Sequence, residues 1–207
     1  MIAELESSAG RKFEQFYSIY TGSLVARERK KRHEIEGLIG RPGYRVFVLE
    51  ESGDVLAFSI VFVARAVGVA LLEYMATDKA RRNAGLGSEI FAQSLAQIDG
   101  LPLLVEVDSD RENADDRDLR ARRKRFYRRC GCVEIANLAY RLPLPGVGAP
   151  PEMDLMVHSN GAQLVLSKAR LRQWLEAVFA DVYGQRADDP RIAAMLSSVN
   201  DPVSLVG

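Results

Sequence analysis

The sequence has few residues of the types that mark specialised protein classes. Cysteine and histidine each occur twice among 207 residues. Cys130 and Cys132 are too few for a disulfide framework, and their Cys-Gly-Cys spacing has no second pair of metal ligands. His33 and His158 stand in no Ser-His-Asp order, so neither a hydrolase triad nor a zinc centre is expected. We expect a protein that works without a metal.

The sequence also lacks an excess of charge and a long hydrophobic run. Lys and Arg number 28, Asp and Glu number 28, and the net charge is +0, which gives no bulk reason to bind nucleic acid or an anionic membrane. No window approaches 18 apolar residues, and the start Met-Ile-Ala-Glu-Leu-Glu does not resemble a signal peptide. We expect a cytoplasmic protein with neither nucleic-acid nor membrane partners.

The length and composition indicate an ordinary globular protein. Apolar residues make up 47% and charged residues 27%, and the chain is long enough for one domain or two at most. We assign residues 1–160 to the main domain. The remaining 161–207 are too few for a core of their own, so they are expected to pack on that domain or on a partner chain. A homodimer is therefore possible.

Hydrophobic spacing predicts helices first and a β-meander next. Phe13, Phe16, Tyr17 and Tyr20 share one helical face, which predicts a helix over 9–20 that ends at Thr21-Gly22-Ser23. A second, very polar helix is predicted over 25–39. Short turns link three β-rich stretches, which predicts an antiparallel meander. The three stretches are 44–49, 55–64 and 68–77.

The pattern then changes to strand, helix, strand. A helix over 85–98 and a strand over 101–107 complete a βαβ unit, so a parallel pair joins the meander in a mixed sheet. An acidic loop and a basic helix ended by Gly131 follow, and Pro and Gly make 143–151 irregular. Short strands are predicted over 132–135, 138–142 and 153–158, and two amphipathic helices over 171–182 and from Pro190.

A glycine-rich turn leads into the helix over 85–98. Its sequence is Arg82-Asn83-Ala84-Gly85-Leu86-Gly87. Glycine lets backbone N–H groups turn outward, and the N-terminus of a helix favours an anion, so the turn suits a diphosphate. It is neither a Walker P-loop nor a dinucleotide fingerprint. The alternative is a turn whose glycines serve packing alone.

Residues 10–142 resemble the GNAT family of acyl-CoA-dependent N-acyltransferases. The turn 82–87 matches that family's Gln/Arg-x-x-Gly-x-Gly/Ala loop, and 123–132 matches its later aromatic-Tyr-x-x-x-Gly-Phe element. The order of the expected elements agrees as well. The resemblance implies an α/β (α+β) fold, with a mixed, splayed sheet flanked by helices. It also implies acetyl-CoA as co-substrate and direct transfer to a primary amine of a small molecule or peptide in a ternary complex.

The resemblance also assigns roles to residues. The backbone of Met75, Ala76 and Thr77 would pair with pantetheine, and Tyr127 would protonate the leaving thiolate. A phenol is well matched to a thiolate as a proton donor, although Tyr127 could instead be a core tyrosine beside Phe126. The loop that would hold the pyrophosphate consists of Arg82, Asn83, Ala84, Gly85, Leu86, Gly87 and Ser88. Two departures stand out: Asn113 lies fourteen residues before Tyr127 and takes no role, and Cys132 replaces the family's Phe.

Two carboxylates in apolar strands are candidates for the general base. Glu73 lies within 69–76, and Glu106 has the same position in the next parallel strand. A carboxylate in such a place is paired, faces solvent or is catalytic. Some members of the family have no protein base.

The basic run 120–129 holds seven basic residues in ten and follows six acids in 108–118. The first interpretation is a solvated helix face neutralised by its own loop. The second is that Arg122 or Arg123 reaches the 3′-phosphate of CoA, and we favour the first with one or two phosphate contacts. A nucleic-acid patch is the third interpretation, and zero net charge weakens it.

The residues of the first two predicted helices do not identify the amine that accepts the acetyl group. Glu28, Glu34 and Glu36 would suit a cationic amine, whereas Arg27, Arg29 and Lys30 would suit an anionic one. A cysteine acyl-enzyme is not expected, because Cys130 and Cys132 follow the C-terminus of a helix, where thiolates are disfavoured. The alternative function is a non-catalytic acyl-CoA-binding or regulatory module whose C-terminal helices dock a partner.

Overall fold

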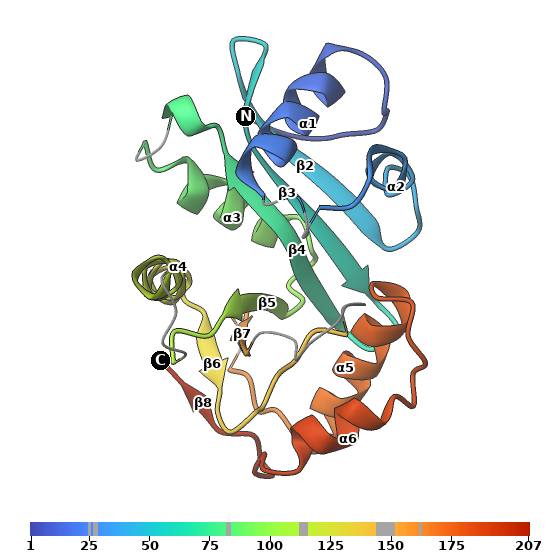
Figure 1. The fold of residues 1–207 in the computed structure, drawn as a ribbon, viewed down its shortest axis with the longest axis vertical. Helices are drawn as coiled ribbons and strands as arrows, with labels where there is room; N and C mark the ends of the chain where they lie inside the picture. Colours follow the sequence, from blue (N-terminus) through green and yellow to red (C-terminus); the bar gives the residue numbers. More distant parts are fainter. Residues whose placement is uncertain (25, 27–28, 82–83, 112–115, 144–151, 162) are drawn as a thin grey trace. The chain divides into compact units, whose positions relative to one another are not determined.

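A computed structural model describes residues 1–24, 26, 29–81, 84–111, 116–143, 152–161 and 163–207. The chain forms two compact units (Figure 1). The first consists of Met1–Val63 and Leu72–Asp99, and the second of Ala64–Leu71 and Gly100–Gly207. Each unit has its own set of strands with helices against them.

The strands of the first unit follow one another in the order β1, β2, β3, β4. The pairs β1–β2 and β2–β3 are antiparallel, and β3 returns from β2 through a turn in which Ser52 and Gly53 have φ of 53° and 84°. Both positive values fit a two-residue hairpin turn. The predicted strands of the meander are confirmed, whereas β1 has no sequence signal. The bounds are β1 Ile2–Glu4, β2 Tyr44–Glu51, β3 Asp54–Ala64 and β4 Val69–Thr77.

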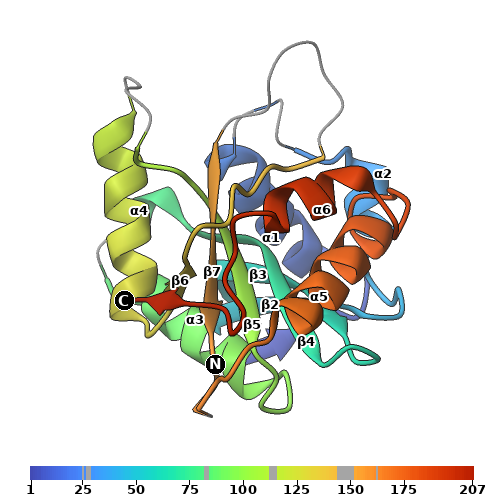
Figure 2. The ribbon, with the colours of Figure 1, turned by 90° about the horizontal axis from the view of Figure 1, so that it is seen from below.

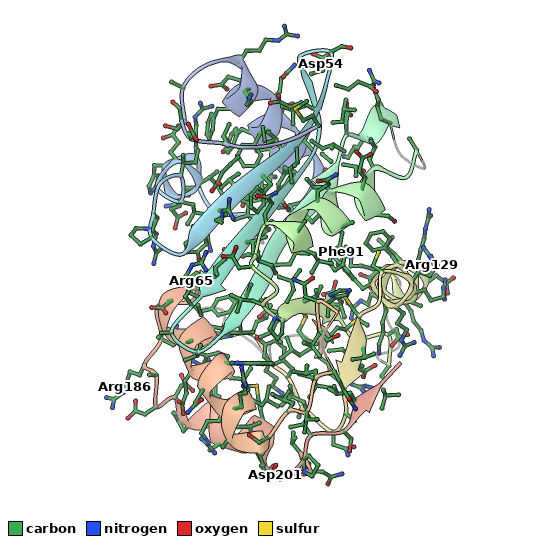
Figure 3. The ribbon with its side chains drawn as sticks, turned by 180° about the vertical axis from the view of Figure 1, so that it is seen from behind. Asp54, Arg65, Phe91, Arg129, Arg186 and Asp201 are labelled. Carbon is green, nitrogen blue, oxygen red and sulfur yellow. The ribbon has the colours of Figure 1, made fainter. Side chains whose placement is uncertain are left out.

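Two helices cover opposite faces of β3. On one face Phe58 meets the ring of Phe16 from α1 (Arg11–Ser23) with 4.9 Å between the ring centroids. On the other, Ser59 shares a buried 2.7 Å hydrogen bond with Ser94 of α3 (Leu86–Ala96), which also buries Phe91 (Figure 3). Because neighbouring strand residues point to opposite faces, this helix–sheet–helix arrangement follows from the alternation along β3.

The two predicted N-terminal helices differ from those observed. The first continues through Thr21 to Ser23, because the Thr21 hydroxyl donates to the Tyr17 carbonyl at 2.9 Å and stays within the helix. The predicted helix over 25–39 is wrong: only α2 (Arg32–Glu36) forms, and 25 and 27–28 lie outside the described residues. At Lys30 the backbone N–H instead donates to the hydroxyl of Tyr20 at 2.8 Å.

The second unit contains β5, β7, β6 and β8 in that order, all paired antiparallel. The predicted strand over 138–142 is wrong, because only Tyr140 forms a bridge, with Met153. The short edge strand β8 was not predicted. The bounds are β5 Leu103–Asp108, β6 Val133–Ile135, β7 Met153–His158, β8 Leu205–Val206, α4 Arg117–Arg129, α5 Lys168–Asp181 and α6 Pro190–Leu196.

Figure 2 shows α4 to one side of β5, β6 and β7, with α5 and α6 to the other. The register explains the division, because Asp154 of β7 faces α4 while its neighbour Leu155 lies opposite Glu106 on the other face. The link 144–151 lies outside the described residues. None of the helices within the described ranges is long and apolar enough to span a membrane.

The C-terminal helices pack within the second unit. Leu171, Trp174 and Phe179 of α5 are 0% exposed, and the indole N–H of Trp174 donates to the Val67 carbonyl at 3.0 Å. These contacts tie α5 to the turn that precedes β4. The division of the chain at residue 160 stays a prediction.

We expect Trp174→Ala to lower the free energy of unfolding by about 3–5 kcal/mol, because it leaves a cavity and an unpaired Val67 carbonyl. Urea unfolding followed by circular dichroism measures this loss. Arg172→Ala, an exposed change on the same helix, is the control and should leave the unfolding midpoint in place. Equal midpoints for both variants would contradict the anchoring role of Trp174.

Candidate active site

The turn at Gly85 sets the N-terminus of the eleven-residue helix α3. Gly85 has φ 80°, and a Cβ built there would meet no atom within 4 Å. The first hydrogen bond within the helix joins the Glu89 N–H to the Gly85 carbonyl at 3.1 Å. The N–H groups of Leu86, Gly87 and Ser88 come before it and have no acceptor inside the helix.

These donors lie where an anion could approach. Gly85 and Ser88 are exposed, whereas Leu86 is buried and anchors the helix. Ala84 is also exposed, and the predicted loop residues Arg82 and Asn83 lie outside the described residues. The positive end of the α3 dipole is therefore open to solvent, as the sequence predicts for a phosphate site.

The strand that leads to this turn changes character along its length. In β4, Val69–Leu72 are buried, whereas the following five residues, which include Met75, Ala76 and Thr77, are only half-buried. The Asp78 N–H then donates to the Leu56 carbonyl at 2.8 Å, which fixes the end of β4 against β3. The backbone that was predicted to pair with pantetheine thus lies in the less covered half of the strand.

Glu73 begins this half of β4 and is paired. Its side chain is 4% exposed, and the Lys30 ammonium lies 2.5 Å from its Oε1. Burial raises the pKa of Glu73, while the positive charge of Lys30 opposes that rise. Of the alternatives open from the sequence, the structure shows the paired carboxylate. The Lys30 ammonium also lies over the ring of Tyr74, 5.8 Å from its centroid, and that ring contacts Tyr20 edge-on.

A pocket of about 460 Å³ lies in the first unit between α1, the start of β3 and the turn after β4. One wall holds Asp54, which accepts hydrogen bonds from Arg11 at 2.7 Å and Gln15 at 2.8 Å. The lining also includes Lys79 and Arg81, close in sequence to the Gly85 turn. Its polar lining carries charges of both signs.

Tyr127 lies on α4 in the second unit and is 8% exposed. Its ring contacts that of Phe126 edge-on, with centroids 5.1 Å apart. Burial raises the pKa of Tyr127 above its ordinary value, so its hydroxyl keeps its proton at neutral pH and can act as a donor but not as a base.

The residues after Tyr127 end its helix. Gly131 has φ 90°, and the Cys132 N–H turns back to donate to the Tyr127 carbonyl at 3.0 Å. Cys132 is 2% exposed, and burial raises its pKa to about 12. A thiol that stays protonated is a poor nucleophile, which makes Cys132 unfavourable as an acyl carrier.

Glu106 is held by two tyrosines in the second unit. The hydroxyl of Tyr140 donates to its Oε1, and that of Tyr183 donates to its Oε2 at 2.5 Å. Glu106 itself is half-buried in a strand whose other residues up to Val107 are buried. Both tyrosines are separated from Glu106 by more than thirty residues. The sequence spacing therefore carries no signal of their role.

The basic helix α4 is largely neutralised by nearby acids. Arg123, the residue predicted to reach the 3′-phosphate, is half-exposed and pairs with Asp108 at 2.7 Å. Arg120 pairs with Asp116 at 2.8 Å, whereas Arg129 points away from the strands (Figure 3). The interpretation of a helix face balanced by its own loop agrees with these pairs.

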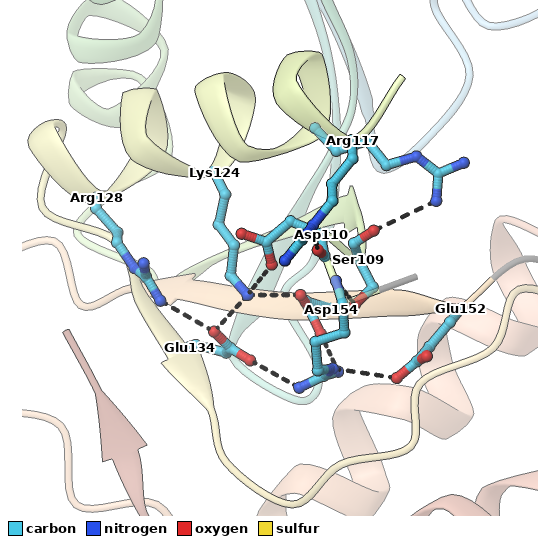
Figure 4. A network of polar contacts seen from close by, with 10 residues as sticks. Ser109, Asp110, Arg117, Lys124, Arg128, Glu134, Glu152 and Asp154 are labelled. Atoms are coloured by element: carbon cyan, nitrogen blue, oxygen red, sulfur yellow. Dashed lines mark hydrogen bonds and ion pairs between the residues drawn. The ribbon is translucent and has the colours of Figure 1, made fainter. Parts of the chain in front are cut away.

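Lys124 is the exception on this helix, because it is buried. Its ammonium lies 2.6 Å from Asp154, 2.8 Å from Glu134 and 3.2 Å from Asp110 (Figure 4). Burial alone would lower the pKa of Lys124, but the hydrogen bonds to Asp154 and Glu134 outweigh it and raise the pKa. Arg111 also pairs with Asp154. The cluster joins α4 and the loop before it to β6 and β7.

The comparisons with known proteins agree with this fold. A protein of the GNAT family from Bacteroides thetaiotaomicron aligns with a TM-score of 0.73 at 19% identity, over 90% of this chain and 99% of its own. An aminoglycoside 6′-N-acetyltransferase complexed with coenzyme A aligns with a TM-score of 0.62 at 13% identity, over 79% and 99%. The ribosomal-protein-S18-alanine N-acetyltransferase of Escherichia coli aligns with a TM-score of 0.54 at 18% identity, over 79% and 96%.

The mixed α/β architecture and the C-terminal helices are thus confirmed. Residues 42–133 match the family model of the acetyltransferase (GNAT) domain, a range that includes both the Gly85 turn and Tyr127. Residues 42–133 of the chain are therefore similar to a GNAT acetyltransferase domain. A search of the curated proteins finds no match.

We expect Asp154→Ala to destabilise the protein by about 3–5 kcal/mol, because it removes a partner from the buried ammonium of Lys124. Asp188→Asn, which alters an exposed ion pair with Arg186, is the matched control and should leave the melting temperature unchanged. Calorimetry on both variants checks this, and a stable Asp154→Ala protein would show that the cluster contributes nothing to stability.

Proposed function

We propose that the chain transfers an acetyl group from acetyl-CoA to a primary amine by direct attack in a ternary complex. The observation that carries the proposal is the exposed turn at Gly85, with its outward N–H groups, inside the range that matches the GNAT domain. The coenzyme A in the structurally similar aminoglycoside 6′-N-acetyltransferase supports the same co-substrate. A cytoplasmic location and a homodimer stay predictions.

The co-substrate is bound mainly by backbone groups in this proposal. The N–H groups of Leu86, Gly87 and Ser88 receive the pyrophosphate, together with the loop residues that precede them. The half-buried backbone of Met75–Thr77 pairs with pantetheine, as the family resemblance implies. Arg123 would reach the 3′-phosphate only by leaving Asp108, so its contribution to binding is a secondary part of the proposal.

The reaction needs one proton donor and one proton acceptor. The amine nitrogen attacks the thioester carbonyl carbon, and the bond from that carbon to sulfur breaks. Tyr127 gives its proton to the leaving thiolate, which burial permits because it keeps the phenol protonated. The nitrogen loses a proton to a carboxylate, directly or through water, and the product is an amide.

Glu106 is our first candidate for the proton acceptor, and Glu73 is the second. The charge of Glu73 is already balanced by the ammonium of Lys30 at 2.5 Å. Glu106 is half-buried, and both of the described tyrosine contacts leave it in its acceptor form. Comparison of the pH profiles of kcat/KM for Glu106→Gln and Glu73→Gln, at their acidic limbs, separates the two candidates.

The acceptor in this proposal is a small-molecule or peptide amine. The names of the two similar acetyltransferases include one of each kind, an aminoglycoside and a ribosomal protein. A panel that contains aminoglycosides and peptides with a free N-terminus, followed by release of CoA, tests for turnover. Binding of CoA without turnover on any amine would favour the regulatory-module alternative.

We expect acetyl-CoA to raise the melting temperature, because it binds the folded state. Gly85→Glu should abolish that rise, since it places a carboxylate beside the proposed pyrophosphate. Gly85→Asn is the control: it also replaces the glycine at φ 80°, but asparagine tolerates this conformation and brings no charge. A full rise in Gly85→Glu, measured by thermal shift, would refute the loop assignment.

We expect Tyr127→Phe to lower kcat by about 10²–10⁴-fold while the affinity for CoA hardly changes, because only the proton donor is lost. The raised pKa of Tyr127 also predicts that its ionisation does not limit wild-type activity below about pH 10, where an ordinary tyrosine would ionise. Steady-state kinetics across pH measure both effects. Wild-type turnover by the Phe variant would place Tyr127 in the core only.

A further inference from the structure

Glu106 receives one of its hydrogen bonds from the C-terminal segment, which lies beyond the range that matches the family. The Tyr183 hydroxyl donates to Oε2 of Glu106 at 2.5 Å, across 77 residues of sequence. The Tyr140 hydroxyl donates to Oε1. Each carboxylate oxygen thus accepts a hydrogen bond from a different part of the chain. Two donated hydrogen bonds favour the ionised carboxylate over the neutral acid.

The position of Tyr183 is fixed by the end of α5. Its N–H donates to the Val178 carbonyl at 3.4 Å, and its carbonyl accepts from the Gln185 side chain at 3.1 Å. Its ring meets that of the fully buried Phe179, with centroids 6.2 Å apart. The hydroxyl therefore needs no large rearrangement to reach Glu106, and little conformational entropy is lost when it does.

The two tyrosines differ in their access to solvent. Tyr140 is 0% exposed, and burial, together with the nearby charge of Glu106, raises its pKa well above the ordinary value. It is a permanent donor. Tyr183 is half-buried and donates to Oε2 of the carboxylate. Removal of its hydroxyl takes away the described donor to Oε2 and keeps the one to Oε1.

We propose that Tyr183 is a positioning residue that orients Glu106 and keeps it ionised, so that the C-terminal helices are part of the catalytic apparatus. The inference rests on the proposed function, in which Glu106 accepts the proton of the amine. Other titratable and charged groups near Glu106 in the described part of the second unit include Tyr140 and, two residues along β5, Asp108 with its partner Arg123. Neither Asp108 nor Arg123 is altered by a change at Tyr183.

The test is Tyr183→Phe in the full chain, which removes one hydroxyl and keeps the ring. Loss of one hydrogen bond to a carboxylate should move the acidic limb of kcat/KM upward by about one pH unit, with the CoA-induced rise in melting temperature unchanged. Ser197→Ala is the matched control, because it removes a hydroxyl from the same segment that donates only to the Ala194 carbonyl, at 2.8 Å, among the contacts described. An acidic limb at the wild-type pH in Tyr183→Phe would overturn the proposal.

A second measurement does not depend on turnover. Carbon-13 NMR of protein labelled at the glutamate side-chain carboxyl carbon follows the titration of Glu106, and the signal missing in Glu106→Gln assigns it. A midpoint that rises in Tyr183→Phe, but not in Ser197→Ala, supports the proposal even if the wild type acetylates no amine in the panel. In that case the proposed function alone would fail. An unmoved midpoint overturns the positioning role, whatever the activity.

Discussion

The ammonium of Lys124 and the carboxylates around it hold the second unit together. A buried cation is stable only if opposite charges lie within a few ångströms, and Asp154, Glu134 and Asp110 meet this condition. Asp154 belongs to β7, Glu134 to the paired strand β6, and Asp110 to the loop before α4. The side chain of Lys124 therefore contacts three separate segments. Tyr127 lies about one helical turn further along α4, on the same buried face as Lys124.

The same rule governs the candidate bases. Both carboxylates lie in strands and find their partners elsewhere in their units: Lys30 for Glu73, two tyrosine hydroxyls for Glu106. The kind of partner decides the chemistry. An ammonium balances a charge and withdraws it from reaction, whereas hydroxyls orient the charge and leave it in place. This contrast is why we propose Glu106 ahead of Glu73 as the proton acceptor.

Local backbone geometry explains why two short motifs carry the family signal. Gly85 adopts a positive φ that opens the N-terminus of α3, and Gly131 adopts one that stops α4 just after Tyr127. Each glycine sets where a helix begins or ends, and so where its functional groups lie. A motif of this kind is visible in the sequence because the constraint acts within a few neighbouring residues.

The sequence by itself determined the strands of the meander, α3, α4, the C-terminal helices, the Gly85 turn and the place of Tyr127 near the end of α4. Periodicity and turn chemistry act between near neighbours, so they can be read locally. It failed where distant residues compete. The predicted helix over 25–39 is replaced by the shorter α2, because Lys30 contacts Tyr20 and Glu73 instead. The strand β8 forms by pairing with β6, which is distant in sequence. The pairing of Lys124 and the tyrosines on Glu106 were decided by tertiary structure alone. Burial makes such partners necessary, but no local pattern specifies which distant residue will supply them.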